Sequence, residues 1–421
     1  MTKQTITQQT TNPPAEEGRL ARVQAWLRVL ELDMRLLGMI GALLTIWIGF
    51  HVLSDGVFIT PRNLYNLAEQ TSVVAIIATG MVLVIVTRNI DLSVGSLLGF
   101  LGMVMAFVQA EVFAVDVSWN WWVTLLIGLA VGALVGAFQG WWIAYQGVPA
   151  FIVTLAGLLI FRGGAWLVTQ GRTVAPLNST FQLLGGGLAG SIGAFWSWVL
   201  GLVGIALLIA NRLFTRQRRQ RLGFPNKPLW AELITTGAIV ALVLAFVMVM
   251  NAYMRPRSDI PRGIPVPVLI MLGIAVIMSA LVRLTKFGRY VFALGGNPEA
   301  AKLAGINTKL VTLMIFVIMG MLCAVAGAVA SARLNAGANA TGTLTELYVI
   351  AATVIGGTSL AGGAGTIIGA ILGAVVMQSL QSGMVLLGVQ SPLQQVIVGF
   401  VLIVAVWIDT RYRRGTGLSD D

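Results

Sequence analysis

Apolar stretches of close to twenty residues recur along almost the whole chain, and they decide what kind of fold it can adopt. A helix needs about 20 mainly apolar residues to cross the hydrocarbon core of a bilayer, which is roughly 30 Å thick. The sequence therefore predicts an all-α polytopic membrane protein with about 12 transmembrane helices. The expected spans cover 36–53, 70–87, 94–114, 121–145, 149–168, 194–211, 231–253, 266–284, 311–332, 346–360, 365–387 and 393–409.

Composition supports a membrane environment and excludes several kinds of site. Hydrophobic residues make up 57% of the chain and charged residues only 10%, whereas a soluble chain carries about 25% charged residues. His51 is the only histidine and Cys323 the only cysteine. Histidine-based metal centres and catalytic triads therefore lack ligands, and a disulfide framework is impossible. We expect neither a metal site nor catalytic residues.

The distribution of basic residues predicts the orientation of the spans. If the N-terminus lies inside, twenty of the 27 lysines and arginines fall in the tails and loops that face the cytoplasm, and six fall outside. This excess follows the positive-inside rule. We therefore expect both termini in the cytoplasm and an even number of crossings. The orientation of the spans therefore explains the net charge of +11, and we expect no nucleic acid as a partner. We expect membrane lipid around the chain.

The chain divides into two tails and one transmembrane domain. Residues 1–35 form a cytoplasmic tail, 36–410 the transmembrane domain, and 411–421 a second cytoplasmic tail. Apolar and basic residues alternate at helical spacing over 19–35, which indicates either an amphipathic helix on the inner leaflet or a charged lead-in to the first span. The span expected at 346–360 is short and ends in glycine, so a broken or re-entrant segment is also open there.

Small residues recur at four-residue steps within three expected spans. Lipid provides no hydrophobic drive for helices to associate, so close backbone approach through small residues has to supply the packing. These faces predict a tightly packed bundle. They comprise Gly128, Gly132, Gly136 and Gly140; Gly320, Ala324 and Ala328; and Gly369 and Gly373.

Two segments interrupt the apolar pattern at similar places relative to their flanking spans. The first, 87–96, places Asp91 at or near membrane depth, where a charge must pair or face an aqueous cavity. Asp91, Ser93 and Ser96 are also suited to capping the following helix. The second, 356–365, is rich in glycine, and such backbone is tolerated only where protein buries it or a cavity borders it. Paired interruptions of this kind indicate a transport pathway.

A third segment, 286–309, forms a long loop on the cytoplasmic side. Gly295 and Gly296 break one element, and Pro298 suits the first turn of a helix that runs from Glu299 to about Ala304. Gly305 then suits the end of that helix. Because the segment is amphipathic and bounded by glycines, we expect it to dock a soluble partner.

These motifs together resemble the permease family of ATP-binding-cassette (ABC) importers for ribose, xylose and arabinose. The Glu299-Ala300-Ala301-x-x-x-Gly305 sequence is similar to the loop by which such permeases engage their ATPases. Further matches in order and spacing lie at 89–96, 148–155, 293–297 and 355–363. The resemblance covers roughly 55–180 and 255–410. Residues from about 190 to 253 add an inserted helix pair, so that ten family-like spans become twelve.

The resemblance implies an importer of the bacterial inner membrane. A pair of permease copies forms the pore, an ABC ATPase subunit binds ATP and Mg²⁺ on the cytoplasmic side, and a periplasmic sugar-binding protein delivers the substrate. The permease itself binds no cofactor. The residues expected to couple to the ATPase are Gly288, Gly296, Asn297, Glu299, Ala300, Ala301 and Gly305. Those expected along the translocation path are Asn89, Asp91, Ser93, Phe151, Thr154, Asn335 and Thr358.

The inserted pair resembles the xylose branch of the family, which implies D-xylose as the substrate. Two other functional classes compete with this interpretation. An ion-coupled secondary sugar transporter requires acidic residues inside the membrane, and Asp91 is the plausible candidate because Glu69 and Glu346 lie near span ends. A membrane-embedded enzyme is not supported, because the sequence has no histidine cluster and no pair of carboxylates suited to catalysis.

Overall fold

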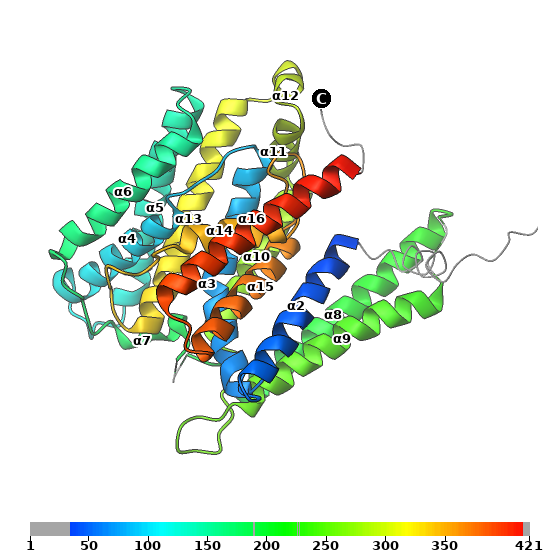
Figure 1. The fold of residues 1–421 in the computed structure, drawn as a ribbon, viewed down its shortest axis with the longest axis horizontal. Coiled ribbons are helices and arrows are strands. Elements are labelled where there is room, and N and C mark those ends of the chain that lie inside the picture. The colour runs from blue at the N-terminus through cyan, green and yellow to red at the C-terminus, as the bar shows by residue number, and fades with distance from the viewer. Residues whose placement is uncertain (1–33, 188–189, 225, 227, 416–421) are drawn as a thin grey trace, which may run out of the picture.

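The chain folds into helices that run roughly alongside one another (Figure 1). The computed structural model describes residues 34–187, 190–224, 226 and 228–415. Most of the predicted N-terminal tail, including its amphipathic helix, lies outside these residues. The all-α class is confirmed, because the described residues form helices, turns and three isolated β-bridges.

Nine helices in the described part of the chain are long and apolar enough to cross a membrane. They are α3 (Pro61–Val86), α4 continued by the π-helix η1 (Val94–Val112), α5 (Asn120–Ala144), α6 (Ala150–Thr169), α8 (Gly193–Arg221), α9 (Leu229–Ala252), α10 (Val266–Leu284), α13 (Thr308–Leu334) and α15 (Ile367–Leu386). The other helices are α2 (Met34–Leu53), α7 (Ser179–Gln182), α11 (Lys286–Gly296), α12 (Pro298–Leu303), α14 (Thr345–Ile355) and α16 (Ser391–Gly415), with a 3₁₀ turn η2 (Leu183–Gly185).

The centre of the bundle is built on α3 and α13, whose side chains are mostly buried. The glycine face of α5 packs on α13, as its four-residue spacing predicts. Gly132 lies against the backbone of Gly320, and Gly136 lies against the backbone of Phe316. Backbones this close leave no room for a Cβ atom, which explains the choice of glycine.

The predicted span at 346–360 contains only a short helix. α14 has 11 residues, so it is about 16 Å long at 1.5 Å per residue and cannot cross a bilayer alone. It packs on α15, where Gly373 lies against the carbonyl of Ala352 and Gly369 against that of Gly356. Irregular backbone flanks α14 on both sides. In these segments Gly337, Thr358 and Ser359 are buried, whereas Ala340 and Ala361 are exposed.

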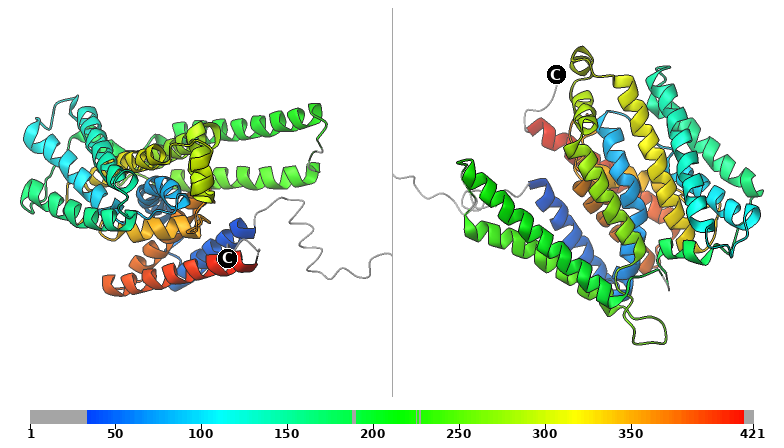
Figure 2. Two further views of the ribbon diagram at one scale, coloured as in Figure 1. Left: turned by 90° about the horizontal axis from the view of Figure 1, so that it is seen from above. Right: turned by 180° about the vertical axis from the view of Figure 1, so that it is seen from behind.

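The inserted pair forms a hairpin of α8 and α9 that projects from the side of the bundle (Figure 2). Both helices are mostly exposed. α8 continues ten residues past the predicted end at 211, so the basic segment 212–221 is helical rather than loop. Arg216 on α8 and Glu232 on α9 form an ion pair near the tip, which joins the two helices where the bundle no longer supports them.

Connections gather at the two ends of the bundle. α11, α12 and the C-terminal end of α16 lie at one end, while α7 and the loop between α9 and α10 lie at the other (Figure 1). α16 is helical to Gly415, so the helix extends into the segment 411–421 that the sequence predicts as a tail. The end that carries α11 and α12 is where the two interruptions of the apolar pattern meet.

Candidate functional site

Three chain segments meet beside α11 at this end of the bundle. The side chain of Arg88, just after α3, donates from Nε to the carbonyl of Gly295 (3.0 Å) and from Nη2 to the carbonyl of Gly296 (2.9 Å). The backbone N–H of Gly363 donates to the carbonyl of Val86 at 2.9 Å. The interruptions at 87–96 and 356–365 therefore lie side by side, and both contact the end of α11. We call this contact of 86–88, 295–296 and 362–363 the three-segment junction.

Glycines allow this junction to close. A Cβ atom on Gly295 would overlap the carbonyl oxygen of Val86, and one on Gly362 would lie 2.6 Å from Cγ of Arg88. Gly362 and Gly363 also have positive φ angles of 89° and 73°, which side chains disfavour. The glycine-rich segment thus serves close packing rather than nucleotide binding.

Asp91 folds back on its own segment. Its Oδ1 accepts hydrogen bonds from the backbone N–H of Ser93 (2.8 Å) and from Ser93 Oγ (2.6 Å). Ser93 is the N-cap of α4, yet no side chain caps the helix there, so the predicted capping role is wrong. The carboxylate makes a local turn instead. Ser96 Oγ donates to the carbonyl of Ser93 at 2.8 Å, which also differs from a cap.

Neighbouring helices hold the Asp91 turn in place. Gln139 on α5 donates from Nε2 to Ser93 Oγ at 2.9 Å, and Thr154 on α6 donates to the carbonyl of Ile90 at 3.2 Å. Asp91, Ser93, Gln139 and Thr154 are all buried. Sequence reasoning missed Gln139, because a lone glutamine within a glycine-rich span has no local signal.

The predicted docking segment presents an exposed surface. α12 begins at Pro298, and Asn297 Oδ1 accepts from the N–H of Ala300 at 2.9 Å to cap it. The chain then turns at Gly305 with φ 80°, so the predicted short helix is confirmed. Leu303, the last residue of α12, is 90% exposed. Its side chain is therefore accessible to a docked protein.

The seven predicted coupling residues all fall within or beside α11 and α12. Gly296, Asn297, Glu299, Ala300 and Gly305 are exposed, whereas Gly288 and Ala301 are buried. Thr285 Oγ1 accepts from the N–H of Gly288 at 3.1 Å and caps α11. The exposed members are accessible to a docked protein, and the two buried ones shape the helices that present them.

The predicted path residues do not form one continuous surface. Asp91, Ser93, Thr154 and Thr358 have no exposed area, Phe151 is 53% exposed on the outside of α6, and Asn89 and Asn335 are partly exposed. Asn335 ends α13 with φ 51° and accepts from the N–H of Leu177 through Oδ1 at 2.9 Å. Its observed role is therefore to fix the connection to α7.

A second polar cluster lies where the connection between α13 and α14 enters the bundle. Arg162 on α6 donates from Nη1 to the carbonyls of Asn339 (3.0 Å) and Thr341 (3.1 Å). Arg162 is therefore a structural partner of backbone carbonyls inside the bundle. Glu346 near the start of α14 is 7% exposed, and its Oε2 is buried without a hydrogen-bond partner among the described residues. The sequence placed Glu346 near the end of a span and did not predict that it is buried.

The opposite end of the bundle is closed by a third polar cluster. Arg262 is 5% exposed, and its guanidinium lies 4.4 Å from the ring centre of Tyr253 and 5.4 Å from that of Tyr65. It donates from Nη1 to the carbonyl of Gly187 at 3.0 Å, while Glu69 Oε1 accepts from the N–H of the same residue at 3.0 Å. The backbone before α8 is thus held from two sides.

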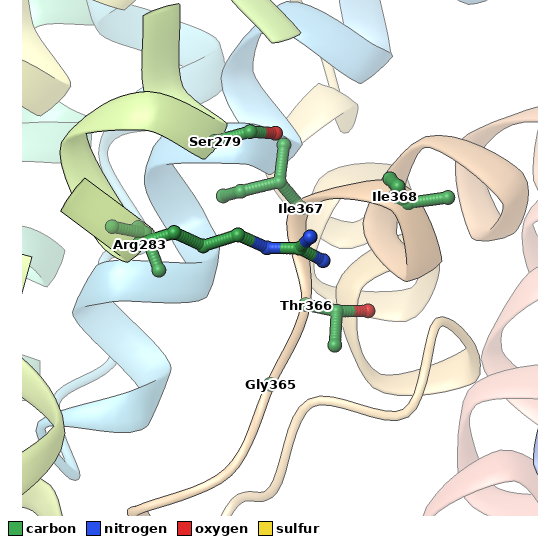
Figure 3. A pocket seen from close by; sticks show the side chains of 7 residues that line it. Ser279, Arg283, Gly365, Thr366, Ile367 and Ile368 are labelled. Atoms are coloured by element: carbon green, nitrogen blue, oxygen red, sulfur yellow. The ribbon is translucent and has the colours of Figure 1, made fainter. Parts of the chain in front are cut away.

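A small pocket lies between the end of α10 and the start of α15 (Figure 3). Ser279 and Arg283 approach it from α10, and Thr366 and Ile367 from the other side. Its volume of about 40 Å³ suits water but is far below the roughly 300 Å³ of a small-molecule site. The pocket does not serve as a sugar site in this conformation.

The comparison with known proteins defines the class to which this fold belongs. A family model described as "Branched-chain amino acid transport system / permease component" matches residues 63–406. The chain belongs to this family of membrane transport permeases.

Individual relatives lie within sugar transport. The chain is 39% identical to the xylose transport system permease protein of Escherichia coli strain K12, over 91% of this chain and 93% of that protein. It is 38% identical to the xylose transport system permease protein of Haemophilus influenzae, over 92% and 99%. The ribose import permease protein of Escherichia coli strain K12 is 34% identical over 84% and 87%. No solved structure matches the chain.

Proposed function

We propose that this protein is the permease subunit of an ATP-driven importer that carries a monosaccharide, D-xylose, across the bacterial inner membrane. The high identity to the two xylose permeases over nearly their whole length carries this proposal. The ribose permease is less similar over less of the chain.

We place the end of the bundle that carries α11 and α12 in the cytoplasm. An ATPase subunit docks there, with Leu303 and Glu299 as contacts. The support is the exposure of the α12 surface and the excess of basic residues in the segments predicted inside. A periplasmic sugar-binding protein engages the opposite end, where α7 and the loop between α9 and α10 lie, and a second permease copy completes the pore.

Twelve crossings are compatible with this arrangement. α14 is too short to span, but the irregular segments 335–344 and 356–366 extend it towards both ends of the bundle. The three-segment junction supports this path, because Gly363 follows α14 and contacts the end of α3 beside α11. Both described chain ends then fall on the cytoplasmic side, as an even number of crossings requires.

An ion-coupled transporter is the alternative, because Glu69 and Glu346 are buried as well as Asp91. Two of them accept hydrogen bonds, however. Glu69 accepts a hydrogen bond from Gly187, and Asp91 accepts two through Oδ1 from Ser93. Asp91 Oδ2 and Glu346 Oε2 are buried without a hydrogen-bond partner among the described residues. The similarity to the two xylose permeases over nearly their whole length is what favours the ATP-driven mechanism.

Uptake of labelled sugar into cells that produce the whole transporter tests the proposal. We expect D-xylose uptake to stop when ATP is depleted and to continue when a protonophore collapses the proton gradient. Unlabelled D-xylose should compete better than D-ribose. If the protonophore stops uptake while ATP depletion does not, the ATP-driven function is wrong. We also predict that the neighbouring genes encode an ATPase and a periplasmic sugar-binding protein.

A further inference from the structure

We propose that Arg88 is a positioning residue that transmits movement of the docking helices α11 and α12 to the Asp91 turn. This inference rests on the proposed function, because it assumes that an ATPase moves α11 and α12. No motif in the sequence points to Arg88. The structure singles it out, because its guanidinium is the side-chain group that ties 87–93 to the end of α11.

The chemistry of the contact favours arginine. The carbonyls of Gly295 and Gly296 belong to the last turn of α11, where unpaired carbonyl groups and the helix dipole attract a cation. Two donors of one guanidinium bind these adjacent carbonyls. A planar fork holds such a pair of acceptors in a fixed orientation, whereas a lysine ammonium is a flexible point charge. The contact therefore transmits direction as well as attraction.

The backbone around Arg88 makes the link short and stiff. Arg88 has a φ of 62°, a left-handed conformation that the surrounding structure must maintain. Its side chain is hydrogen-bonded to α11, and Asp91 follows only three residues later. Between them, the carbonyl of Ile90 accepts from Thr154 on α6. A displacement of α11 therefore reaches the Asp91 turn through one side chain and three residues.

The glycine-rich segment closes the third side of the same junction. Gly363 donates to the carbonyl of Val86, and Gly362 packs on the aliphatic part of the Arg88 side chain. The two interruptions of the apolar pattern consequently move with α11 as one unit. Such a junction couples an event at the docking surface to backbone in the bundle interior.

Reconstituted transporter tests the role. The backbone conformation should survive in Arg88→Asn, because asparagine tolerates the left-handed region, and Arg88→Lys keeps the charge without the fork. Arg283→Gln, an exposed arginine at the end of α10, is the control. We expect R88N to lower the sugar transported per ATP hydrolysed by about tenfold, from the loss of two charge-assisted hydrogen bonds. R88K should fall between R88N and the wild type, and R283Q should match the wild type. An unchanged ratio in R88N would overturn the inference.

Labelling at the Asp91 turn separates transmission from a merely structural cap. Ile90 is 37% exposed, and the native Cys323 is fully buried, so maleimide reports on Ile90→Cys. We expect the labelling rate to change when the ATPase docks with a non-hydrolysable ATP analogue. In the Arg88→Asn background the ATPase should still bind, but this change should vanish.

A rate change that persists in R88N, or no change in the Ile90→Cys protein when the ATPase binds, would contradict the transmission role while leaving the proposed function intact. Failure of the ATPase to bind the wild-type permease would instead contradict the proposed function, and the inference with it. Melting temperatures of the variants in detergent identify any loss of the fold.

Discussion

Gly132 on α5 and Gly320 on α13 lie directly against each other, and neither position leaves room for a Cβ atom. A Cβ on Gly132 would overlap the carbonyl oxygen of Gly320, and a Cβ on Gly320 would overlap that of Gly132. This pair brings the backbones of α5 and α13 into direct contact. It converts a four-residue spacing in the sequence into a specific helix pair.

Replacing Gly132 by alanine should destabilise the protein. The added methyl group has to displace α5 from α13, and overpacking of this kind costs about 1–3 kcal/mol. Gly273→Ala on α10 is the matched control, because no atom lies within 4 Å of the position of its Cβ. Thermal unfolding in detergent should show a lower midpoint for G132A and little change for G273A. Equal midpoints would mean that the α5–α13 contact is looser than the structure indicates.

Leu303 should be a binding determinant of α12. A leucine that is 90% exposed contributes little to folding but gains a buried environment when a partner covers it. We expect Leu303→Glu to weaken binding of the ATPase subunit by at least about tenfold, corresponding to roughly 1.4 kcal/mol. Leu207→Ala, at an exposed position of α8 far from α12 in the sequence, is the control. Binding of the purified ATPase to permease in nanodiscs measures the effect, and wild-type affinity of L303E would exclude α12 as the docking site.

The turn at Gly305 should be needed for coupling rather than for folding. Its φ of 80° disfavours alanine by roughly 1 kcal/mol but is more accessible to asparagine. We therefore expect Gly305→Ala to reduce sugar uptake per ATP hydrolysed, and Gly305→Asn to recover part of the loss. Glu299→Gln, at the exposed start of α12, should also reduce this ratio. Normal uptake in G305A and E299Q would contradict their assignment to the coupling segment.

The Asp91 turn should contribute to stability through its hydrogen bonds. Asp91→Ala leaves two buried donors of Ser93 without their acceptor, at a cost of about 1–3 kcal/mol. Asp91→Asn retains an acceptor oxygen and should lose less than half as much. Thermal unfolding of the two variants compares them directly. Equal losses in both would indicate that the negative charge, rather than the hydrogen bonds, stabilises this turn.

The sequence predicts the helices and the bounds of α12 well, because these depend on residues close together in the chain. Apolar length located most of the spans, and Pro298 and Gly305 located α12 to within about one residue. The glycine steps on α5 and α13 also predicted which faces pack. The predicted end of a helix was wrong where the helix continues through polar residues beyond the apolar stretch, as α8 does after residue 211.

Long-range polar contacts were beyond the reach of sequence reasoning. Arg88 and Gly295 are 207 residues apart, and nothing local distinguishes Arg88 from any other basic residue at a span end. Asp91 was a clear candidate for a helix cap, but its carboxylate accepts from the N–H of Ser93 rather than from the free N–H groups in the first turn of α4. The burial of Glu346 likewise depends on how the irregular segment before α14 enters the bundle.

The central claim is that this permease moves D-xylose at the expense of ATP bound to a partner. Its most direct test is uptake of labelled D-xylose by proteoliposomes that contain the permease and its ATPase, with the sugar-binding protein on the opposite side. We predict uptake that requires ATP on the ATPase side, persists in the presence of a protonophore and is lost in L303E. Uptake without ATP that the protonophore abolishes would contradict the account.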